Sequence, residues 1–344
     1  MKQKMLRNIP ALAAGSVLVG VALLTKALRR SRAIEFNGRV ALVTGGSRGL
    51  GLLIARELGR QGAKVVIAAR DEDELSRAKA DLLGRGIEVT TVATDLATPS
   101  EAERAVNACV SAYGQLDLLI NNAGVITVGP FDNLSKADFD QAMAIHFWAP
   151  LYTMQAALPH MRKIGGGRIV NVSSIGGKLG VPHLAAYCAS KFALTGFSQS
   201  VRAELARENI LITTVCPGLM RTGSIFNAWF KGRHREEFTW FAIAGSLPLL
   251  SIDATRAAAR VVDAAKHGDA EIVITWTAKL AVAAAGIFPQ LTASATGLAN
   301  RFLPKPAEHD GDHTFSGWQS GSEWAPSPLT RLSERAASLN NELP

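Results

Sequence analysis

The feature that most constrains the fold is a regular alternation of two kinds of segment between Gly38 and Thr275. Short apolar runs of strand length alternate with amphipathic runs of helix length. The short runs are rich in β-branched and aliphatic residues, as expected of strands covered by helices on both faces. Seven such runs occur, at 40–44, 64–68, 88–93, 116–121, 167–172, 211–216 and 271–275. Because strand–helix–strand crossovers are right-handed, the pattern predicts one α/β domain with a doubly wound, seven-stranded parallel sheet.

A glycine-rich turn follows the first run, where ligands of such sheets bind. It reads Thr44-Gly-Gly-Ser-Arg-Gly-Leu-Gly51, and a helix pattern starts at Leu52. Gly45, Gly49 and Gly51 stand where a Cβ would obstruct a tight turn, a pyrophosphate or helix–strand packing. The free N–H groups of a helix N-terminus also suit a phosphate. Glycines close ordinary turns too, so this motif alone is weak evidence, and the missing Lys-Ser/Thr ending disfavours a nucleoside triphosphate.

The end of the second run points to the phosphorylated form of a dinucleotide. NAD sites of this type usually carry an acid there, but this run ends in Ala69 and Arg70. Without that carboxylate, Arg70 and Arg48 can hold the 2′-phosphate of NADP, so we expect NADP(H) to be preferred over NAD(H). Solvated surface arginines are the alternative, and they would leave the preference open. Asp95 and Leu96 are expected near the adenine.

Tyr187 and Lys191 form a candidate acid–base pair. Residues four apart share one face of a helix, so the ammonium is expected near the phenol, where it favours the ionised form. A lower pKa would let the phenol exchange a proton with a substrate oxygen at neutral pH. Taken alone, this spacing is more often a helix-face aromatic beside a solvated lysine.

Five motifs in a fixed order together resemble the short-chain dehydrogenase/reductase family, over about residues 37–275. They are the glycine turn, Asn121-Asn-Ala-Gly124, Ser173-Ser174, Tyr187-Cys-Ala-Ser-Lys191 and Pro217-Gly218. The resemblance implies a Rossmann-type fold and hydride transfer between a nicotinamide and a carbonyl or secondary alcohol, with Tyr187 as acid and base. It also implies that Lys191 binds the cofactor ribose and that Ser174 holds the substrate oxygen. Ser174 is chosen over Ser173 because of its spacing from Tyr187.

The resemblance gives a full set of expected cofactor contacts and one departure. The contacts are Gly45, Ser47, Arg48, Gly49, Leu50, Gly51, Arg70, Asp95, Leu96, Asn122, Ala123, Gly124, Tyr187, Lys191, Pro217, Gly218 and Thr222. The family commonly has an asparagine on the helix before the fifth strand, where this chain has His146. A histidine there could keep the proton relay from Lys191 to solvent, or make it pH-dependent, and is therefore a candidate catalytic residue. A packed helix histidine is an equal possibility.

Residues 226–241 follow Thr222 and resemble the family's substrate lid. They contain six aromatic residues, namely Phe226, Trp229, Phe230, Phe238, Trp240 and Phe241. Such a lid suits a large apolar substrate of steroid, retinoid or fatty-acyl type. The same rings could pack on a neighbouring subunit or a bilayer. The basic stretch Lys231-Gly-Arg-His-Arg235 would suit an acidic headgroup or a carboxylate.

The N-terminal segment, residues 1–32, has a net charge of +7 out of +8 for the chain. The remaining residues are nearly neutral, which argues against nucleic-acid binding. Asn8–Thr25 carries no charge and would span roughly 27 Å as a helix, slightly less than a bilayer core. We expect a membrane anchor or interfacial helix with a cytoplasmic catalytic domain. A cleaved signal or a buried helix is the alternative.

Two further segments follow the main domain. Residues 276–304 are read as a helical appendage that packs on the core, on a partner or on a membrane interface. Residues 305–344 are read as a polar, mostly disordered tail. Its cluster His309-Asp-Gly-Asp-His313 lacks an element to fix ligands, so no metal site is expected.

Three isolated cysteines, Cys109, Cys188 and Cys216, fit small core residues in a reduced compartment. We also expect a homo-oligomer. The competing interpretation of the whole chain is a non-catalytic regulatory or scaffold protein that keeps the fold and binds the cofactor without turnover. The presence of Ser174, Tyr187 and Lys191 favours an enzyme.

Overall fold

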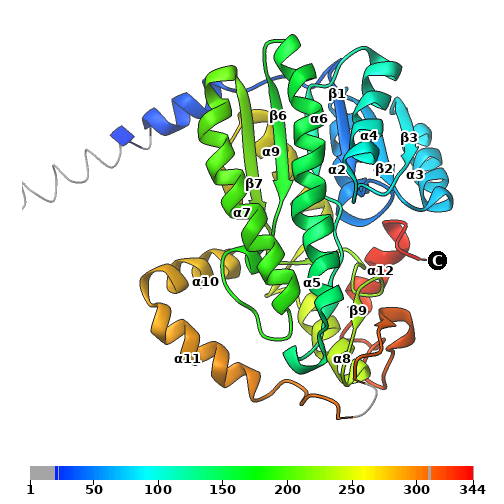
Figure 1. Ribbon diagram of the computed structural model, residues 1–344, viewed down its shortest axis with the longest axis vertical. Coiled ribbons are helices and arrows are strands. Elements are labelled where there is room, and N and C mark those ends of the chain that lie inside the picture. The colour runs from blue at the N-terminus through cyan, green and yellow to red at the C-terminus, as the bar shows by residue number, and fades with distance from the viewer. Residues whose placement is uncertain (1–19, 22, 309–310, 344) are drawn as a thin grey trace, which may run out of the picture.

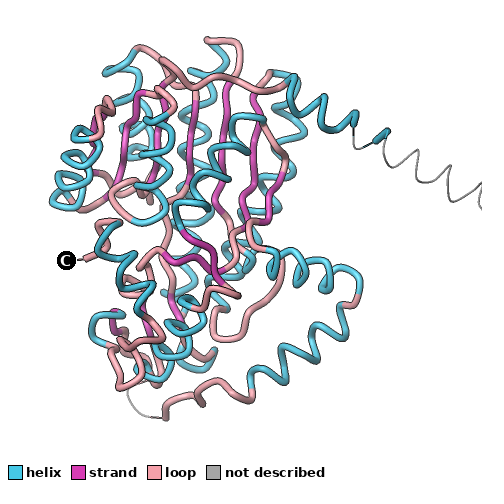
Figure 2. The backbone as a smooth tube through the Cα atoms, turned by 180° about the vertical axis from the view of Figure 1, so that it is seen from behind, coloured by secondary structure: helices cyan, strands magenta, loops and turns pink. Residues whose placement is uncertain are grey.

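A seven-stranded parallel sheet forms the centre of the protein, seen here in a computed structural model that describes residues 20–21, 23–308 and 311–343 (Figures 1 and 2). The strands, in chain order, are β1 (Val40–Thr44), β2 (Lys64–Ala69), β3 (Val89–Ala93), β4 (Leu118–Asn121), β6 (Gly167–Val172), β7 (Ile210–Cys216) and β11 (Glu271–Val273). The spatial order is β11-β7-β6-β4-β1-β2-β3. The predicted Rossmann-type sheet is confirmed, and each strand end lies within two residues of its predicted position.

Helices cover both faces of this sheet, as the continuous apolar strands require. One face is packed by α2 (Gly49–Arg60), α3 (Glu72–Gly84) and α9 (Ala254–His267). The other is packed by α4 (Pro99–Tyr113), α6 (Ala149–Lys163) and α7 (Ala185–Leu205). Successive side chains of a strand point to opposite faces, so Ala41 and Val43 of β1 join the first cluster while Val40 and Leu42 join the second.

The strand order reverses next to β1, which pairs with β2 on one side and β4 on the other. In open parallel sheets a crevice forms at this point, outside the carboxyl ends of the strands. The glycine turn follows β1 and the Asn122 motif follows β4, so both reach this crevice.

A smaller aromatic core lies below the carboxyl ends of the main sheet. It is built around β5 (Thr127–Val128), β9 (Trp229–Phe230) and α8 (His234–Ser246). The short strands β8 (Leu219–Arg221) and β10 (Ser251–Asp253) pair with each other, and α5 (Lys136–Met143) lies against α7. Four of the six predicted lid aromatics are buried in the aromatic core, namely Phe226, Phe230, Phe238 and Phe241. Lys231 is also buried and pairs with Asp138 at 2.6 Å. The expectation that its cation would receive an acidic headgroup is therefore wrong, because a carboxylate already neutralises it.

The C-terminal segment is folded over its described residues, so the prediction of a mostly disordered tail is wrong. Residues 311–343 contain β12 (Phe315–Ser316), which pairs with β9, and α12 (Arg331–Leu339). Trp318 stacks on Phe226 with 4.7 Å between ring centroids, and Ala337 is buried in the aromatic core. The C-terminal segment has few apolar residues of its own, but these residues pack against the aromatic side chains of residues 226–241. In the cluster at 309–313, residues 309 and 310 lie outside the described residues.

At the other end of the chain, residues 23–31 form a helix that projects from the body (Figures 1 and 2). Arg29 joins this helix to α9 and the following loop through ion pairs with Asp263 and Asp269. Most of the predicted anchor lies outside the described residues. Within residues 20–21, 23–308 and 311–343, no helix is both long enough and apolar enough to cross a bilayer.

A pair of helices, α10 (Trp276–Ile287) and α11 (Pro289–Asn300), stands away from the sheet (Figures 1 and 2). Its large apolar side chains are exposed, including Trp276, Phe288 and Leu291. Ala278 is the only buried residue of the two helices, so the interpretation that they pack on the core is wrong. A partner subunit or a membrane interface remain predictions.

Candidate active site

A cavity of about 770 Å³ opens at the carboxyl ends of the strands. Every predicted catalytic and cofactor-binding residue lines it except Gly51. It runs from the glycine turn at the start of α2 to Tyr187 and Lys191 on α7. The motifs that the sequence placed at separate strand ends therefore meet around one space.

The glycine turn has the shape that its sequence predicted. Gly45 has a φ of +62°, and a Cβ there would lie 2.9 Å from Ala123 Cα. A Cβ at Gly51 would overlap the carbonyl of Gly45, so Gly51 serves the packing of the turn rather than the cavity wall. The Asn122 amide donates to the carbonyls of Thr44 and Gly45 at 3.1 and 3.2 Å. This bond ties the end of β4 to the turn and fixes the mouth of the crevice.

The catalytic candidates come from two elements, β6 and α7. Ser174 follows β6, and its Oγ accepts a hydrogen bond from Gly176 N at 3.0 Å. Tyr187 and Lys191 share one face of α7, and the Lys191 Nζ lies 5.7 Å from the centroid of the Tyr187 ring. The Nζ donates to the carbonyl of Val172 at 2.8 Å, which holds it at the cavity. The predicted trio is thus brought together.

The electrostatics of this trio differ from the prediction. Burial raises the pKa of Tyr187 to about 12, and the lowering effect of the Ser174 side chain is smaller. Burial lowers the pKa of Lys191 to about 7. The expected lowering of the phenol pKa by the ammonium is therefore not found, because loss of water around both groups is the larger effect. Tyr187 carries its proton at neutral pH, as a proton donor in a carbonyl reduction must.

The choice between the two serines is supported by their hydrogen bonds. The Ser173 hydroxyl is buried and bonded to the Lys191 carbonyl at 3.0 Å and to Thr195 Oγ1 at 2.8 Å. It therefore fixes α7 against β6. Ser174 accepts one bond from its own turn and has a hydroxyl proton to give, so it is the serine suited to hold a substrate oxygen.

His146 lies in a π-helical turn, Ala144–Trp148, between α5 and α6. Its Nε2 accepts from Val125 N at 3.1 Å, and its Nδ1 lies 2.8 Å from Ser190 Oγ. Burial and the charge of Lys191 hold the pKa of His146 well below 6.5. The ring is neutral at working pH with its proton on Nδ1, and this N–H donates a hydrogen bond to Ser190 Oγ. These contacts favour a packed histidine over a pH-dependent relay, while a relay through the neutral ring stays a prediction.

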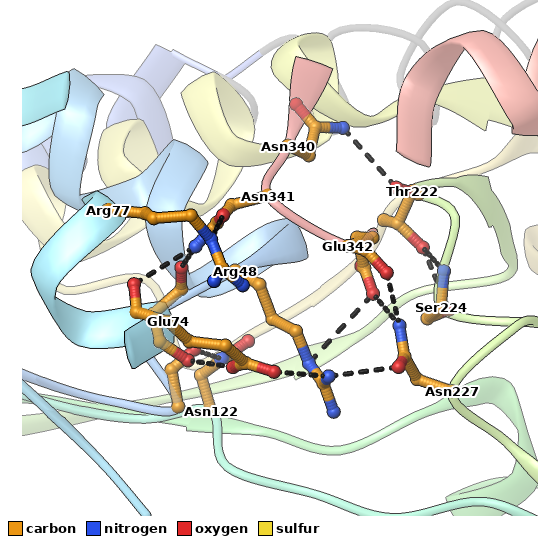
Figure 3. Close-up of polar contacts among 12 residues, drawn as sticks. Arg48, Glu74, Arg77, Asn122, Thr222, Ser224, Asn227, Asn340, Asn341 and Glu342 are labelled. Carbon is orange, nitrogen blue, oxygen red and sulfur yellow. Dashed lines mark hydrogen bonds and ion pairs between the residues drawn. The ribbon is translucent and has the colours of Figure 1, made fainter. Parts of the chain in front are cut away.

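The end of the cavity beside the glycine turn is here called the phosphate end. It contains carboxylates that the motifs did not indicate. The Arg48 guanidinium donates to Glu74 at 2.7 Å and to Asn227 at 2.9 Å, and lies 3.9 Å from Glu342 (Figure 3). Arg70 is exposed at the cavity wall and makes no ion pair among the described residues. Glu74 could have been found, since it stands in the first turn of the helix after β2. Glu342, in a segment without motif or periodicity, gave no signal.

The remaining predicted contacts lie where the resemblance placed them on the cavity wall. They are Asp95 and Leu96 after β3, Pro217 and Gly218 after β7, and Thr222 after β8. Thr222 Oγ1 donates to Ser224 Oγ at 2.8 Å, which holds the loop after β8 in shape. The site residues fit a dinucleotide, since an anion-binding helix N-terminus and an acid–base pair lie at the two ends of one cavity.

Comparison with known proteins identifies the family. Residues 39–229, more than half of the chain, match the family described as short chain dehydrogenase. The chain therefore belongs to the short-chain dehydrogenase/reductase family of oxidoreductases, which act on carbonyl and alcohol groups. It is 38% identical over 213 residues to a dehydrogenase/reductase SDR family protein 7-like chain of Anopheles gambiae, covering 60% of this chain and 67% of the relative.

Two solved structures share the fold. L-sorbose reductase of Gluconobacter frateurii, in complex with NADPH and L-sorbose, has a TM-score of 0.63 at 25% identity, covering 70% of this chain and 97% of that one. A short-chain dehydrogenase/reductase of Burkholderia phymatum in complex with NAD has a TM-score of 0.68 at 24% identity, covering 75% and 96%. The second likeness shows the fold alone. One neighbour holds NADPH and the other NAD, so a nicotinamide cofactor is common to both.

Proposed function

We propose that this chain is an NADP(H)-dependent oxidoreductase that interconverts a carbonyl group and a secondary alcohol on a lipophilic molecule, with Tyr187 as acid and base. The observation that carries the proposal is that Ser174, Tyr187 and Lys191 line the same cavity as the glycine turn. When bound, a nicotinamide supplies or accepts the hydride.

Each catalytic side chain has a task that follows from its surroundings. Ser174 donates a hydrogen bond to the substrate oxygen and keeps it beside Tyr187. Tyr187 gives its proton to that oxygen as negative charge develops during reduction. Lys191, fixed by the Val172 carbonyl, places its amine near the phenolate that remains, and the protonated form of this amine offsets the burial of that charge. In the oxidation direction the same groups act in reverse.

The proposed preference for NADP(H) rests on the arginines of the phosphate end. Ala69 gives no carboxylate for ribose hydroxyls, and Arg70 is exposed on the cavity wall with its charge uncompensated among the described residues. Arg48 contributes less than the sequence suggested, because Glu74 shares its charge. Arg70 is therefore the main residue for a 2′-phosphate.

A lipophilic substrate is proposed on the apolar part of the cavity lining. Val125, Ile126, Phe226, Trp229 and Trp318 line the cavity. A steroid, retinoid or fatty-acyl carbonyl matches such a wall, because apolar surfaces define the shape and a few polar groups define the reacting atom. Trp318 comes from the C-terminal segment, so that segment contributes to the cavity wall.

We also propose that the N-terminal segment attaches the protein to a membrane with the catalytic domain in the cytoplasm, and that the protein is a homo-oligomer. The basic, acid-free composition of residues 1–32 supports the first, and the exposed apolar side chains of α10 and α11 support the second. Detergent-free fractionation of the full chain and of a form lacking residues 1–32 tests the anchor. Equal solubility of the two forms would refute it, and light scattering of the soluble form reports the oligomer.

Turnover tests the proposed function directly. Purified protein with NADPH and a panel of lipophilic ketones and aldehydes should consume the cofactor. Consumption is measured as the loss of nicotinamide absorbance. Tyr187→Phe should lower the rate by about 10² to 10⁴ while still binding NADPH. Tyr152→Phe, on α6 and outside the cavity lining, is the matched control and should leave the rate unchanged. Binding without turnover in wild-type protein would instead support the regulatory or scaffold alternative.

A further inference from the structure

The last described residues of the chain reach the phosphate end of the cavity, far from their neighbours in sequence (Figure 3). Asn340 accepts a hydrogen bond from the backbone N–H of Gly49 at 2.9 Å. The Asn341 amide donates to the carbonyls of Ser47 at 2.8 Å and Glu74 at 3.0 Å. Residues 340–342, here called the C-terminal strap, therefore hold the glycine turn through their backbone and side chains.

The strap also forms hydrogen bonds to the opposite wall of the cavity. The Asn340 amide donates to the Thr222 carbonyl at 3.4 Å, and the Asn227 amide donates to the Glu342 carboxylate at 2.7 Å. Thr222 and Asn227 belong to the loop between β8 and β9. The strap thus bridges the two walls between which a dinucleotide must lie if the proposed function is right.

The strap places a carboxyl group at a site suited to an anion. Glu342 is 3% exposed, and its carboxylate lies directly against Gly49, where a Cβ would meet it. Gly49 begins α2, and the start of a helix presents free N–H groups and a partial positive charge. The carboxylate also lies 3.9 Å from the Arg48 guanidinium. A carboxyl group of the chain itself therefore occupies the part of the cavity best suited to phosphate.

We propose that the C-terminal strap is an intramolecular competitor of the dinucleotide, holding the glycine turn closed until it is displaced. This inference rests on the proposed cofactor-binding function. The strap takes a backbone donor of the turn and brings a carboxylate next to Arg48, and both would oppose a bound phosphate. Displacement leaves the rest of the C-terminal segment in place, because α12 is anchored separately by the burial of Ala337 and by a 2.7 Å bond between Ser333 and Ser246.

The test compares cofactor binding with and without the strap in the full-length protein. One variant ends after Leu339. A second, Asn341→Gly, keeps the left-handed backbone at this residue, where φ is 57°, but removes the side-chain bonds to Ser47 and Glu74. Glu323→Gln, an exposed carboxylate of the same C-terminal segment, is the matched control. Dissociation constants for NADPH and NADH are measured by calorimetry, independently of turnover.

Removal of the strap should tighten binding of both cofactors by about tenfold, because the apparent dissociation constant is the intrinsic value divided by the open fraction. Asn341→Gly should tighten it by a smaller factor, and Glu323→Gln should leave it unchanged. Hydrogen exchange gives a second measurement. In the wild-type protein, NADPH should increase exchange in a peptide covering residues 331–343.

Three other outcomes would overturn the proposal, and the measured affinities and hydrogen exchange distinguish them. Equal affinities in all variants would mean that the strap does not compete, while leaving the proposed function intact. Weaker binding after truncation, with decreased exchange when NADPH is added, would make the strap a clamp over the cofactor instead. Failure of every form to bind either dinucleotide would overturn the proposed function itself.

Discussion

The two ends of the cavity are held in different ways. At the catalytic end, Tyr187 and Lys191 lie on one helix, and Ser174 follows an adjacent strand, so short-range geometry and the central sheet fix all three. At the phosphate end, the glycine turn is contacted by Asn340 and Asn341 from the end of the chain. The catalytic end is part of the main core, whereas the phosphate end is completed by a segment that packs on its surface.

This difference separates parts that are fixed from parts that can exchange. The Lys191 carbonyl and the neighbouring Ser173 hydroxyl are buried within the interface of α7 and β6. Moving them would open the core. The strap is bound by a few hydrogen bonds, each worth about 0.5–1.5 kcal/mol net, and so can leave without unfolding the domain. On the proposed function, the catalytic groups are therefore held by the core, while the strap at the edge of the core sets the access of the cofactor.

After the loss expected for Tyr187→Phe, the largest expected effect at the catalytic end is the difference between the two serines. Ser174→Ala should lower kcat by about 10² to 10³, as expected when a hydrogen-bond donor to the reacting oxygen is lost. Ser173→Ala should retain most of the activity but lower the unfolding free energy by about 1–3 kcal/mol, because Thr195 and the Lys191 carbonyl lose a buried partner. Steady-state kinetics of both variants measure kcat, and denaturant unfolding measures the unfolding free energy. A larger loss of kcat in Ser173→Ala would exchange their roles.

The contrast between the ends also explains how far sequence reasoning reached. The strands follow from periodicity, so they could be predicted. The glycine turn and the pair Tyr187 and Lys191 are short motifs that are weak evidence alone, and they could be predicted because five such motifs in order resemble one family. Asn341 and Ser47 are 294 residues apart and lie in segments with no shared pattern, so their contact could not. The C-terminal segment looked disordered because its apolar partners, such as Phe226, stand elsewhere in the chain. The pKa of Tyr187 was misjudged because burial outweighs the nearby amine, and sequence alone does not give burial.

The second prediction concerns the arginines of the phosphate end. Arg70→Ala should lower kcat/KM for NADPH by about tenfold or more and leave that for NADH nearly unchanged, since a charge-assisted bond to the 2′-phosphate contributes about 1.5–3 kcal/mol. Arg48→Ala should cost less, because Glu74 already shares its charge. Arg85→Ala serves as control, because this exposed arginine follows the other end of α3, outside the cavity lining, and is paired with Asp81. An unchanged ratio of NADPH to NADH in Arg70→Ala would remove the basis of the proposed preference.

The third prediction uses the charge of Glu342. Burial and the nearby Glu74 raise the pKa of this carboxyl to about 7, against lowering contributions from Arg48 and Asn227. The docked strap therefore holds a proton more tightly than the free strap. Docking is favoured at low pH and weakens as the pH rises from about 4.5, the ordinary value, through 7. NADH should thus bind up to about tenfold more tightly at pH 8 than at pH 6.

Glu342→Gln isolates that titration. Glutamine keeps the shape of the protonated acid, so its strap should dock equally at both pH values and the pH dependence of NADH binding should disappear. NADH is used because the 2′-phosphate of NADPH titrates in the same range. The form ending after Leu339 should bind tightly at both pH values. A pH dependence that persists in Glu342→Gln would assign the titration to another group.

The smallest expected effect returns to the catalytic end. His146→Asn should change kcat by less than about threefold, because asparagine can still accept from Val125 and donate to Ser190, and the pH profile between 6 and 8 should not move. His146→Leu should lower the unfolding free energy by about 1–3 kcal/mol, since both partners lose a buried bond. The depressed pKa gives a further signature. Only the unfolded chain protonates His146 near pH 6.5, so wild-type stability should fall below that pH by up to about 1.4 kcal/mol per unit, and His146→Asn should lose this slope. A shifted pH–rate profile in His146→Asn would instead place the ring in the proton path.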